Sequence, residues 1–147
     1  MKSSFVFADK AVLRVLDANL NRAREGLRVG EEVARLILAD FSLTRRFQKL
    51  RYSLEKLRNT FGGDLLPARD ARRDVGRPSG RKPASRYRNT RDLVSANLRR
   101  VEEALRVLEE FSRFRSIRAA QSFGLLRFRT YTLEQEILSK LPALRHR

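Results

Sequence analysis

The 147-residue sequence contains no cysteine, and its single histidine, His146, lies next to the C-terminus. Without cysteine the chain forms no disulfide and no thiolate metal site. The position of the histidine argues against histidine-based catalysis or metal ligation. No apolar run approaches the roughly 18 residues that a membrane span requires, and Met1–Lys10 lacks the apolar core of a signal peptide. We therefore expect a soluble, cytoplasmic protein with no membrane partner.

Motifs of several enzyme classes are also missing. The sequence has no Walker A motif, no GxGxxG, no zinc-binding pattern and no Ser-His-Asp set, and no segment has the alternation of a β-strand. The length, residues 1–147, suits a single domain that can bury a core of its own. Fold and function must therefore be inferred from charge, periodicity and internal repetition.

Positive charge is abundant. The formal net charge is +16, and residues 69–92 contain nine basic residues against three acidic ones. A basic surface attracts polyanions of any kind, including nucleic acid, acidic lipid and nucleotide phosphates. Nucleic-acid binding is the simplest interpretation of such a segment, but charge alone does not choose among these partners.

One pattern, AN-L-x-R-x-x-E-x-L-R-V-x-E-E, occurs twice. The copies span Ala18–Arg35 and Ala96–Arg113, 78 residues apart, and agree at 11 of 18 positions, seven of them Asn, Arg or Glu. A helix duplicated only for its core would keep its hydrophobic positions and let the polar ones change. The repeat therefore predicts two equivalent helices that contribute matched polar groups to one pseudo-symmetric site or groove.

Helical periodicity predicts the elements. A first helix from about residue 10 to 39, with Asp9 as its N-cap, would bury a seam every three or four residues. Glycines at 26 and 30 inside it indicate close approach of another backbone or a ligand, or a kink. Further helices are expected at 43–60, 90–113 and 117–141. The predicted seam consists of Leu13, Leu16, Leu20, Ala23, Leu27, Gly30, Ala34 and Ile37.

The second and fourth expected helices also match each other, because Phe47, Leu50 and Arg51 align with Phe123, Leu126 and Arg127 at an offset of 76. The duplicated unit is therefore a helical hairpin. We predict an all-α fold in which two repeated hairpins form a pseudo-two-fold four-helix arrangement. Repeat one covers about residues 10–60, a long basic loop covers 61–89, and repeat two covers about 90–141.

Several polar residues of the repeat are candidates for binding. Repeated arginines beside the apolar seam, Arg22 and Arg100, suit phosphate because an unpaired guanidinium is costly to bury. The repeated Asn19 and Asn97 could equally cap or bridge helices. Glu25, Arg28, Glu32 and Arg35 share one helical face, for which a solvated set of ion pairs is the simpler explanation.

The loop contains a second candidate, the segment from Arg69 to Gly76. Asp70 and Asp74 lie four residues apart among arginines and could hold Mg²⁺ together with phosphates. They could also pair with neighbouring arginines and organise the loop, which the spacing alone favours.

With these motifs, the chain resembles the small hydroxymethylpyrimidine-phosphate kinase domain that occurs alone or fused to thiamine-phosphate synthase in bacteria. The resemblance covers about residues 13–138. It rests on the segments LDANLNRAREGLRVGEEVARLIL (16–38), LRYSLEKL (50–57), ARDARRDVG (68–76), DLVSANLRRVEEALRVLEEFSRF (92–114) and LLRFRTYTLEQEI (125–137). It implies ATP- and Mg²⁺-dependent phosphorylation of 4-amino-5-hydroxymethyl-2-methylpyrimidine monophosphate to the diphosphate, with free hydroxymethylpyrimidine excluded. Two features depart from the family pattern: Gly30, and the basic stretch after Gly76.

The resemblance and the repeat together suggest roles. Arg22 and Arg100 would clamp phosphate oxygens, while Asp70 and Asp74, with Glu25 or Glu103, would hold Mg²⁺. Arg69 would help to close the loop over ATP. The remaining members of the expected substrate- and phosphate-binding set are Asn19, Asn97, Arg28, Arg106 and Gly76.

Two other functions remain open. A basic helical protein that binds nucleic acid would explain the charge, but not the faithful duplication of acidic residues. A non-catalytic domain that docks on thiamine-phosphate synthase is the other alternative. A homodimer is a further expectation, because Phe5, Val6 and Phe7 would need cover.

Overall fold

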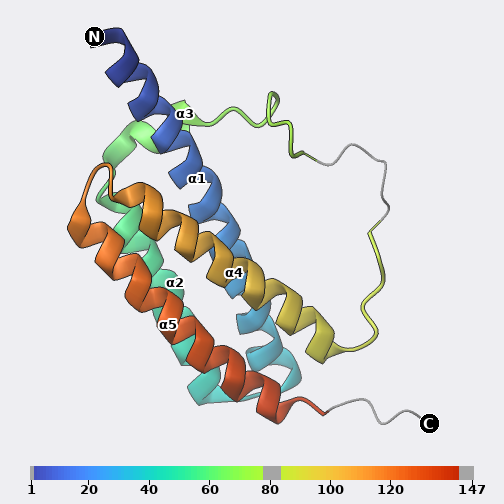
Figure 1. The fold of residues 1–147 in the computed structure, drawn as a ribbon. Helices are drawn as coiled ribbons and strands as arrows, with labels where there is room; N and C mark the ends of the chain where they lie inside the picture. Colours follow the sequence, from blue (N-terminus) through green and yellow to red (C-terminus); the bar gives the residue numbers. More distant parts are fainter. Residues whose placement is uncertain (1, 78–83, 143–147) are drawn as a thin grey trace.

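The computed structural model describes residues 2–77 and 84–142, with side chains from Asp9 onward. Every regular element within these residues is helical (Figure 1), so the predicted all-α class is confirmed. The four long helices are α1 (Lys2–Glu32), α2 (Phe41–Asn59), α4 (Thr90–Ser112) and α5 (Ile117–Lys140). A 3₁₀ turn (Gly62–Asp64) and the short α3 (Leu65–Ala68) follow α2, where the sequence predicted only a loop.

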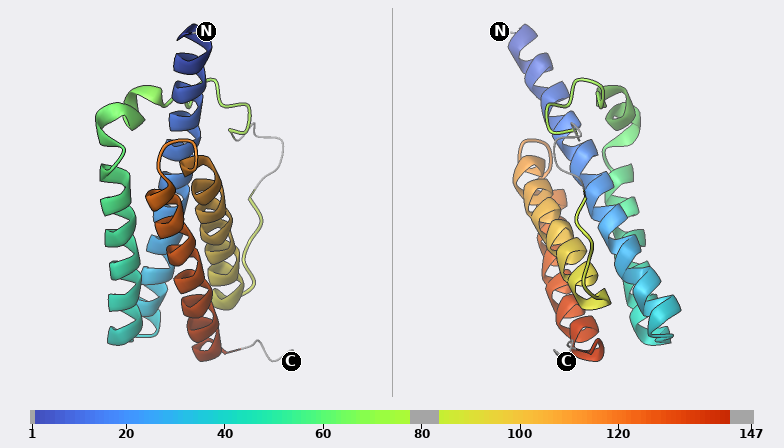
Figure 2. Two further views of the ribbon diagram at one scale, coloured as in Figure 1. Left: turned by 60° about the vertical axis from the view of Figure 1, so that its left-hand side comes forward. Right: turned by 90° about the vertical axis from the view of Figure 1, so that its right-hand side faces the viewer.

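The long helices form two layers. The helix α1 packs along α4, α2 packs along α5, and each hairpin spans both layers (Figures 1 and 2). The segments 69–77 and 84–89 lie on the outer side of the α1–α4 layer, away from α2 and α5 (Figure 2). One continuous core lies between the layers and includes the fully buried Leu16, Phe47, Leu98 and Phe123.

Glycine sets the distance between α1 and α4. A Cβ built on Gly26 would lie 2.5 Å from Val101 Cγ2 and 3.0 Å from the Asn97 carbonyl oxygen. At Gly30 a Cβ would lie 2.6 Å from the ring of Phe47. The close approach predicted at these glycines is therefore to a neighbouring helix backbone at Gly26 and to a core aromatic ring at Gly30.

The two ends of α1 correct the sequence prediction. The helix begins at Lys2, so Asp9 is an interior residue whose carboxylate pairs with Arg115 and is not an N-cap. At the other end α1 continues into a π-helical turn, Val33–Ile37. A π turn holds more residues than an α turn and rotates the apolar face. Val33 and Ala34 are therefore buried, whereas Ile37, predicted in the seam, is 58% exposed.

The three later long helices lie within two residues of their predicted bounds. Their N-caps are Asp40, Asn89 and Ser116, whose side chains accept hydrogen bonds from backbone N–H groups three residues ahead. Each cap satisfies a donor that the first helical turn leaves free. Across the described parts of the chain, none of the helices combines the length and apolar character needed to cross a membrane.

Candidate functional site

Each hairpin is closed by an equivalent ion pair between its two helices, more deeply buried in repeat one than in repeat two. In repeat one, Arg51 donates to Glu31 from Nε at 2.5 Å and from Nη2 at 3.1 Å. In repeat two, Arg127 donates to Glu109 Oε2 from Nη2 at 3.0 Å and from Nε at 3.3 Å. Burial alone would raise the pKa of Glu31, but the hydrogen bonds and charge of Arg51 lower it overall. These arginines therefore hold α2 on α1 and α5 on α4.

The other charged positions of the repeat extend these pairs. Arg28 lies 3.6 Å from Glu31 and 3.2 Å from Glu32. Arg106 has the same partners in repeat two, at 3.6 Å from Glu109 and 3.2 Å from Glu110, and Arg35 and Arg113 complete the two sets. Many of the charged residues that the repeat duplicates thus form half-exposed ion pairs. This agrees with the simpler explanation given above for Arg28, Glu32 and Arg35, a solvated set of ion pairs.

Beside each of these ion pairs lies an open hollow. The repeat-one hollow has a volume of about 300 Å³ and is lined by Arg24, Glu25, Arg28 and Arg51. The repeat-two hollow has a volume of about 430 Å³ and is lined by Arg99, Glu102, Glu103, Arg106, Arg127 and Tyr131. Glu25, Arg28 and Arg51 of the first correspond to Glu103, Arg106 and Arg127 of the second. The repeat therefore forms two equivalent hollows, each containing two residues of the predicted binding set.

The two hollows differ at one buried position. Where repeat one has the exposed Arg24, repeat two has Glu102, which is 8% exposed and whose Oε2 has no hydrogen-bond partner in the described structure. Burial, and after it the neighbouring carboxyl group of Glu134, raise the pKa of Glu102 to about 8. Glu102 thus keeps its proton at neutral pH. Sequence reasoning missed it because its only signal is a mismatch within the repeat.

The remaining polar residues of the repeat lie at the crossing of α1 and α4. The side-chain amides of Asn19 and Asn97 each donate to the backbone carbonyl four residues earlier, both at 2.9 Å. Arg22 donates to Asn19 Oδ1 at 3.4 Å, and both Arg22 and Arg100 are exposed. The structure therefore has the asparagines bonded to their own helices and leaves the two arginines open to solvent.

The start of the long connection is fixed to α1. Arg69 binds the buried Asp17 through two hydrogen bonds of 2.8 Å, and Arg14 donates to the Asp70 carbonyl at 2.9 Å. Residues beyond Asp70 bond mainly to one another: Asp70 accepts from Arg73 N at 3.3 Å, and Asp74 accepts from Gly76 N at 2.8 Å. Asp17 is a positioning residue that the sequence analysis did not single out.

The carboxylates of Asp70 and Asp74 organise the loop, as the spacing favoured. Among the described residues, no three acidic or histidine side chains gather into a metal-binding group. Mg²⁺ is commonly held by one or two carboxylates together with water and substrate phosphates, so the magnesium role of this pair stays a prediction. Arg81 and Lys82 of the basic stretch, His146, and the side chains of Phe5, Val6 and Phe7 lie outside the described part.

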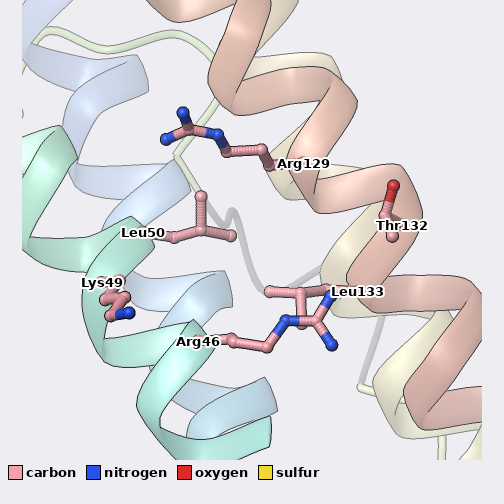
Figure 3. Close-up of a pocket in the computed structure, with 6 residues that line it drawn as sticks. All are labelled: Arg46, Lys49, Leu50, Arg129, Thr132 and Leu133. Atoms are coloured by element: carbon pink, nitrogen blue, oxygen red, sulfur yellow. The ribbon is translucent and has the colours of Figure 1, made fainter.

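A third depression lies between α2 and α5, and the sequence analysis did not predict it. It has a volume of about 410 Å³ and combines apolar walls, Leu50 and Leu133, with basic side chains (Figure 3). Of these, Arg46 pairs with Glu136, while Lys49 and Arg129 are exposed. None of its polar lining residues is identical between the repeats, which is why repetition did not reveal it.

Comparison with known proteins identifies the family. Residues 14–136 match the model of the ThiD2 family. This chain belongs to the ThiD2 family. It is 44% identical to a thiamine-phosphate synthase of Synechocystis sp. over 132 residues, which cover 89% of the chain and 38% of that relative. It is 37% identical to a thiamine-phosphate synthase of Rhodopirellula baltica over 141 residues, covering 94% of the chain and 37% of the relative.

The ThiD2 chain thus spans less than two fifths of the length of these curated relatives. The same holds for the thiamine-phosphate synthase of Nostoc punctiforme, which is 38% identical over 129 residues, 88% of the chain and 36% of the relative. No solved structure matches the chain. The relatives therefore establish the family of this segment.

Proposed function

We propose that this ThiD2 chain acts in thiamine biosynthesis as a kinase that converts 4-amino-5-hydroxymethyl-2-methylpyrimidine monophosphate to the diphosphate at the expense of ATP. The family match and relatives named as thiamine-phosphate synthases support the place in thiamine biosynthesis. The observation that carries the kinase proposal is the duplicated arginine-rich set. Arg22 and Arg100 are exposed on α1 and α4, and Arg28 and Arg106 line the two hollows.

The reaction makes few chemical demands on the protein. The acceptor is a phosphate monoester that carries about −1.5 to −2 charges at pH 7, so it needs no base. An acceptor oxygen forms a bond to the γ-phosphorus of ATP while the bond from that phosphorus to the β,γ-bridging oxygen breaks, which releases ADP. Two polyanions must be held together for this transfer, and guanidinium groups supply that attraction.

The residues of this chain divide the task. Arg22 and Arg100 would clamp phosphate oxygens on the open face of the α1–α4 layer, while Asn19 orients Arg22. Asp70 and Asp74 would hold Mg²⁺, which when bound neutralises charge on the transferring phosphates. Arg69, fixed by Asp17, keeps this loop segment close to α1.

Product formation tests the proposal directly. The monophosphate and free hydroxymethylpyrimidine are incubated separately with Mg-ATP, and we expect diphosphate from the monophosphate alone. Arg22→Ala and Arg100→Ala should each lower kcat/KM by at least about tenfold, the lower end of the loss for removing a charged phosphate contact. Arg118→Ala, an exposed arginine of α5 outside the three hollows, is the matched control. Wild-type kcat/KM in both variants would contradict the clamp.

A non-catalytic role as a partner of thiamine-phosphate synthase is the second candidate. It is favoured by one observation, that the curated relatives contain this segment within longer chains of that name. A folded protein that forms no diphosphate but binds a separate thiamine-phosphate synthase in a pull-down would support this role over the kinase.

A further inference from the structure

The repeat-two hollow brings together three kinds of side chain. Glu102 is buried, and its Oε2 has no hydrogen-bond partner in the described structure. Tyr131 also lines the hollow and is 41% exposed. Arg99, Arg106 and Arg127 supply guanidinium groups, of which Arg99 forms no ion pair with any described residue. A carboxyl group, a flat aromatic ring and a free guanidinium match a small ligand that carries a polar ring edge and an anion.

We propose that this hollow is the subsite for the aminopyrimidine monophosphate, in which Glu102 recognises the amino edge of the ring, Tyr131 covers its face and Arg99 binds the phosphate. The identity of the ligand rests on the proposed function. The assignment of the hollow rests on the contacts described here, and it makes Glu102 a specificity-determining residue.

The protonation of Glu102 decides what it can recognise. A 4-aminopyrimidine edge offers an N–H donor beside a ring-nitrogen acceptor. A protonated carboxyl group offers an O–H donor beside a carbonyl acceptor, so both hydrogen bonds can form at once. An ionised carboxylate has acceptors only and would leave the ring nitrogen unbonded. The raised pKa of Glu102, about 8, keeps the matching form at neutral pH.

The difference between the repeats explains why only the repeat-two hollow would bind the aminopyrimidine monophosphate. At the positions of Glu102 and Tyr131, repeat one has Arg24 and Glu55. The repeat-one hollow therefore has neither a buried carboxyl group nor an aromatic ring, and its lining is dominated by arginine. The shared residues, Glu103 and Arg106 with their counterparts, are common to both hollows and cannot distinguish one ligand from another.

The charged neighbours of Glu102 come from both elements that line the hollow. On α4 they are Arg99, Glu103 and Arg106, and on α5 they are Arg127, Tyr131 and Glu134. Among these, Glu134 raises the pKa of Glu102 and Arg99 lowers it. Arginine stays charged at any accessible pH, and the ligand phosphate is close to fully ionised above pH 7. Ionisation of Glu102 is therefore expected to dominate the binding change between pH 7 and pH 9.

Calorimetric binding of the monophosphate to the whole chain, without ATP, tests the assignment. We expect wild-type affinity to fall by about tenfold from pH 7 to pH 9 as Glu102 loses its proton. Glu102→Gln, whose amide offers a donor and an acceptor at any pH, should bind within about threefold of wild type at pH 7 and lose that pH dependence. Glu102→Ala should bind at least about tenfold more weakly at pH 7.

Two variants complete the design. Glu134→Gln should shift the loss of affinity to lower pH, because it removes a group that raises the pKa of Glu102. Glu55→Gln, the same chemical change at an exposed position of the other hairpin, should behave as wild type. Circular dichroism on each variant confirms that it is folded.

Turnover with Mg-ATP, measured on the same preparations, separates this inference from the proposed function. Binding that follows Glu102 without diphosphate formation would support the hollow and contradict the kinase. Turnover by the wild type, together with unchanged affinity and pH dependence in Glu102→Ala, would contradict the assignment of the hollow as the substrate subsite. It would leave the kinase proposal intact. Failure of the wild type to bind the monophosphate would also overturn the hollow.

Discussion

Gly26 is the residue on which the approach of the two central helices depends. Gly26→Ala would place a Cβ 2.5 Å from Val101 Cγ2 and 3.0 Å from a backbone oxygen that cannot move without its helix. We expect a loss of about 2 kcal/mol in the free energy of unfolding, as is usual for overpacking. Urea denaturation of the wild type and the variant measures this difference in the free energy of unfolding. Gly63→Ala, whose new Cβ would have nothing within 4 Å, should change stability by less than about 0.5 kcal/mol. Equal changes in the free energy of unfolding for Gly26→Ala and Gly63→Ala would show that α1 and α4 can move apart without loss of stability.

Glu102 makes stability depend on pH in an unusual direction. Its pKa is about 8 in the folded protein against 4.5 for an unperturbed glutamate. A raised folded-state pKa contributes stability that is fully present below pH 4.5 and is lost as the pH rises to about 8. Glu102→Gln should therefore become more stable than wild type as the pH rises. We expect a gain of at least about 2 kcal/mol at pH 9, or at least roughly 4–8 °C in Tm, and almost none at pH 4.5. A gain independent of pH would mean that Glu102 ionises normally.

Pairing of α1 with α2, and of α4 with α5, relies on ion pairs of unequal burial. The side chain of Glu31 is 3% exposed and that of Glu109 is 23% exposed. Glu31→Gln leaves Arg51 without its charged partner and should cost about 2 kcal/mol at pH 7, whereas Glu109→Gln should cost about 1 kcal/mol. The lowered pKa of Glu31 adds stability above pH 4.5 that is lost as the pH falls below that value.

Thermal unfolding of both variants at pH 7 and pH 3 measures these costs. The deficit of Glu31→Gln should shrink at pH 3, because the carboxyl group of the unfolded wild type is protonated there and part of the stability gained from the lowered pKa is lost. A deficit of the same size at both pH values would show that packing, and not charge, holds the hairpin.

Much of this arrangement of helices could be predicted from the sequence, because repetition and the apolar period reflect packing directly. The seam from Leu13 to Ala34 is buried as predicted. The prediction is wrong at Ile37, because a π turn rotates the end of the helix. No local residue pattern predicts this turn. Asp9 was mistaken for a cap because a good capping residue can equally lie on the exposed side of a longer helix and pair with Arg115.

The candidate site was less predictable, for a physical reason. Sequence spacing within one helix predicts pairs such as Arg28 with Glu32, but not which face of a second helix closes on them. The hollows depend on Arg51 and Arg127 reaching across from α2 and α5. Glu102 acquires its raised pKa mainly from burial in the folded protein and from Glu134, 32 positions away. The roles proposed for Arg22, Arg100, Asp70 and Asp74 stay predictions.

The molecule as a whole connects its two halves by one long segment, and the buried Asp17 fixes the beginning of that segment to the first half. Asp17→Asn removes the charge that Arg69 binds at 2.8 Å through two hydrogen bonds. Loss of a charge-assisted contact of about 1 kcal/mol raises the population of the open loop roughly fivefold. We therefore expect trypsin to cleave after Arg72 or Arg73 about fivefold faster, as followed by mass spectrometry of the new termini. Asp64→Asn, an exposed carboxylate in the 3₁₀ turn before α3, should leave this rate unchanged. If both variants are cleaved at the wild-type rate, Asp17 does not restrain the loop, and the proposed positioning of Asp70 near α1 must rest on Arg14 alone.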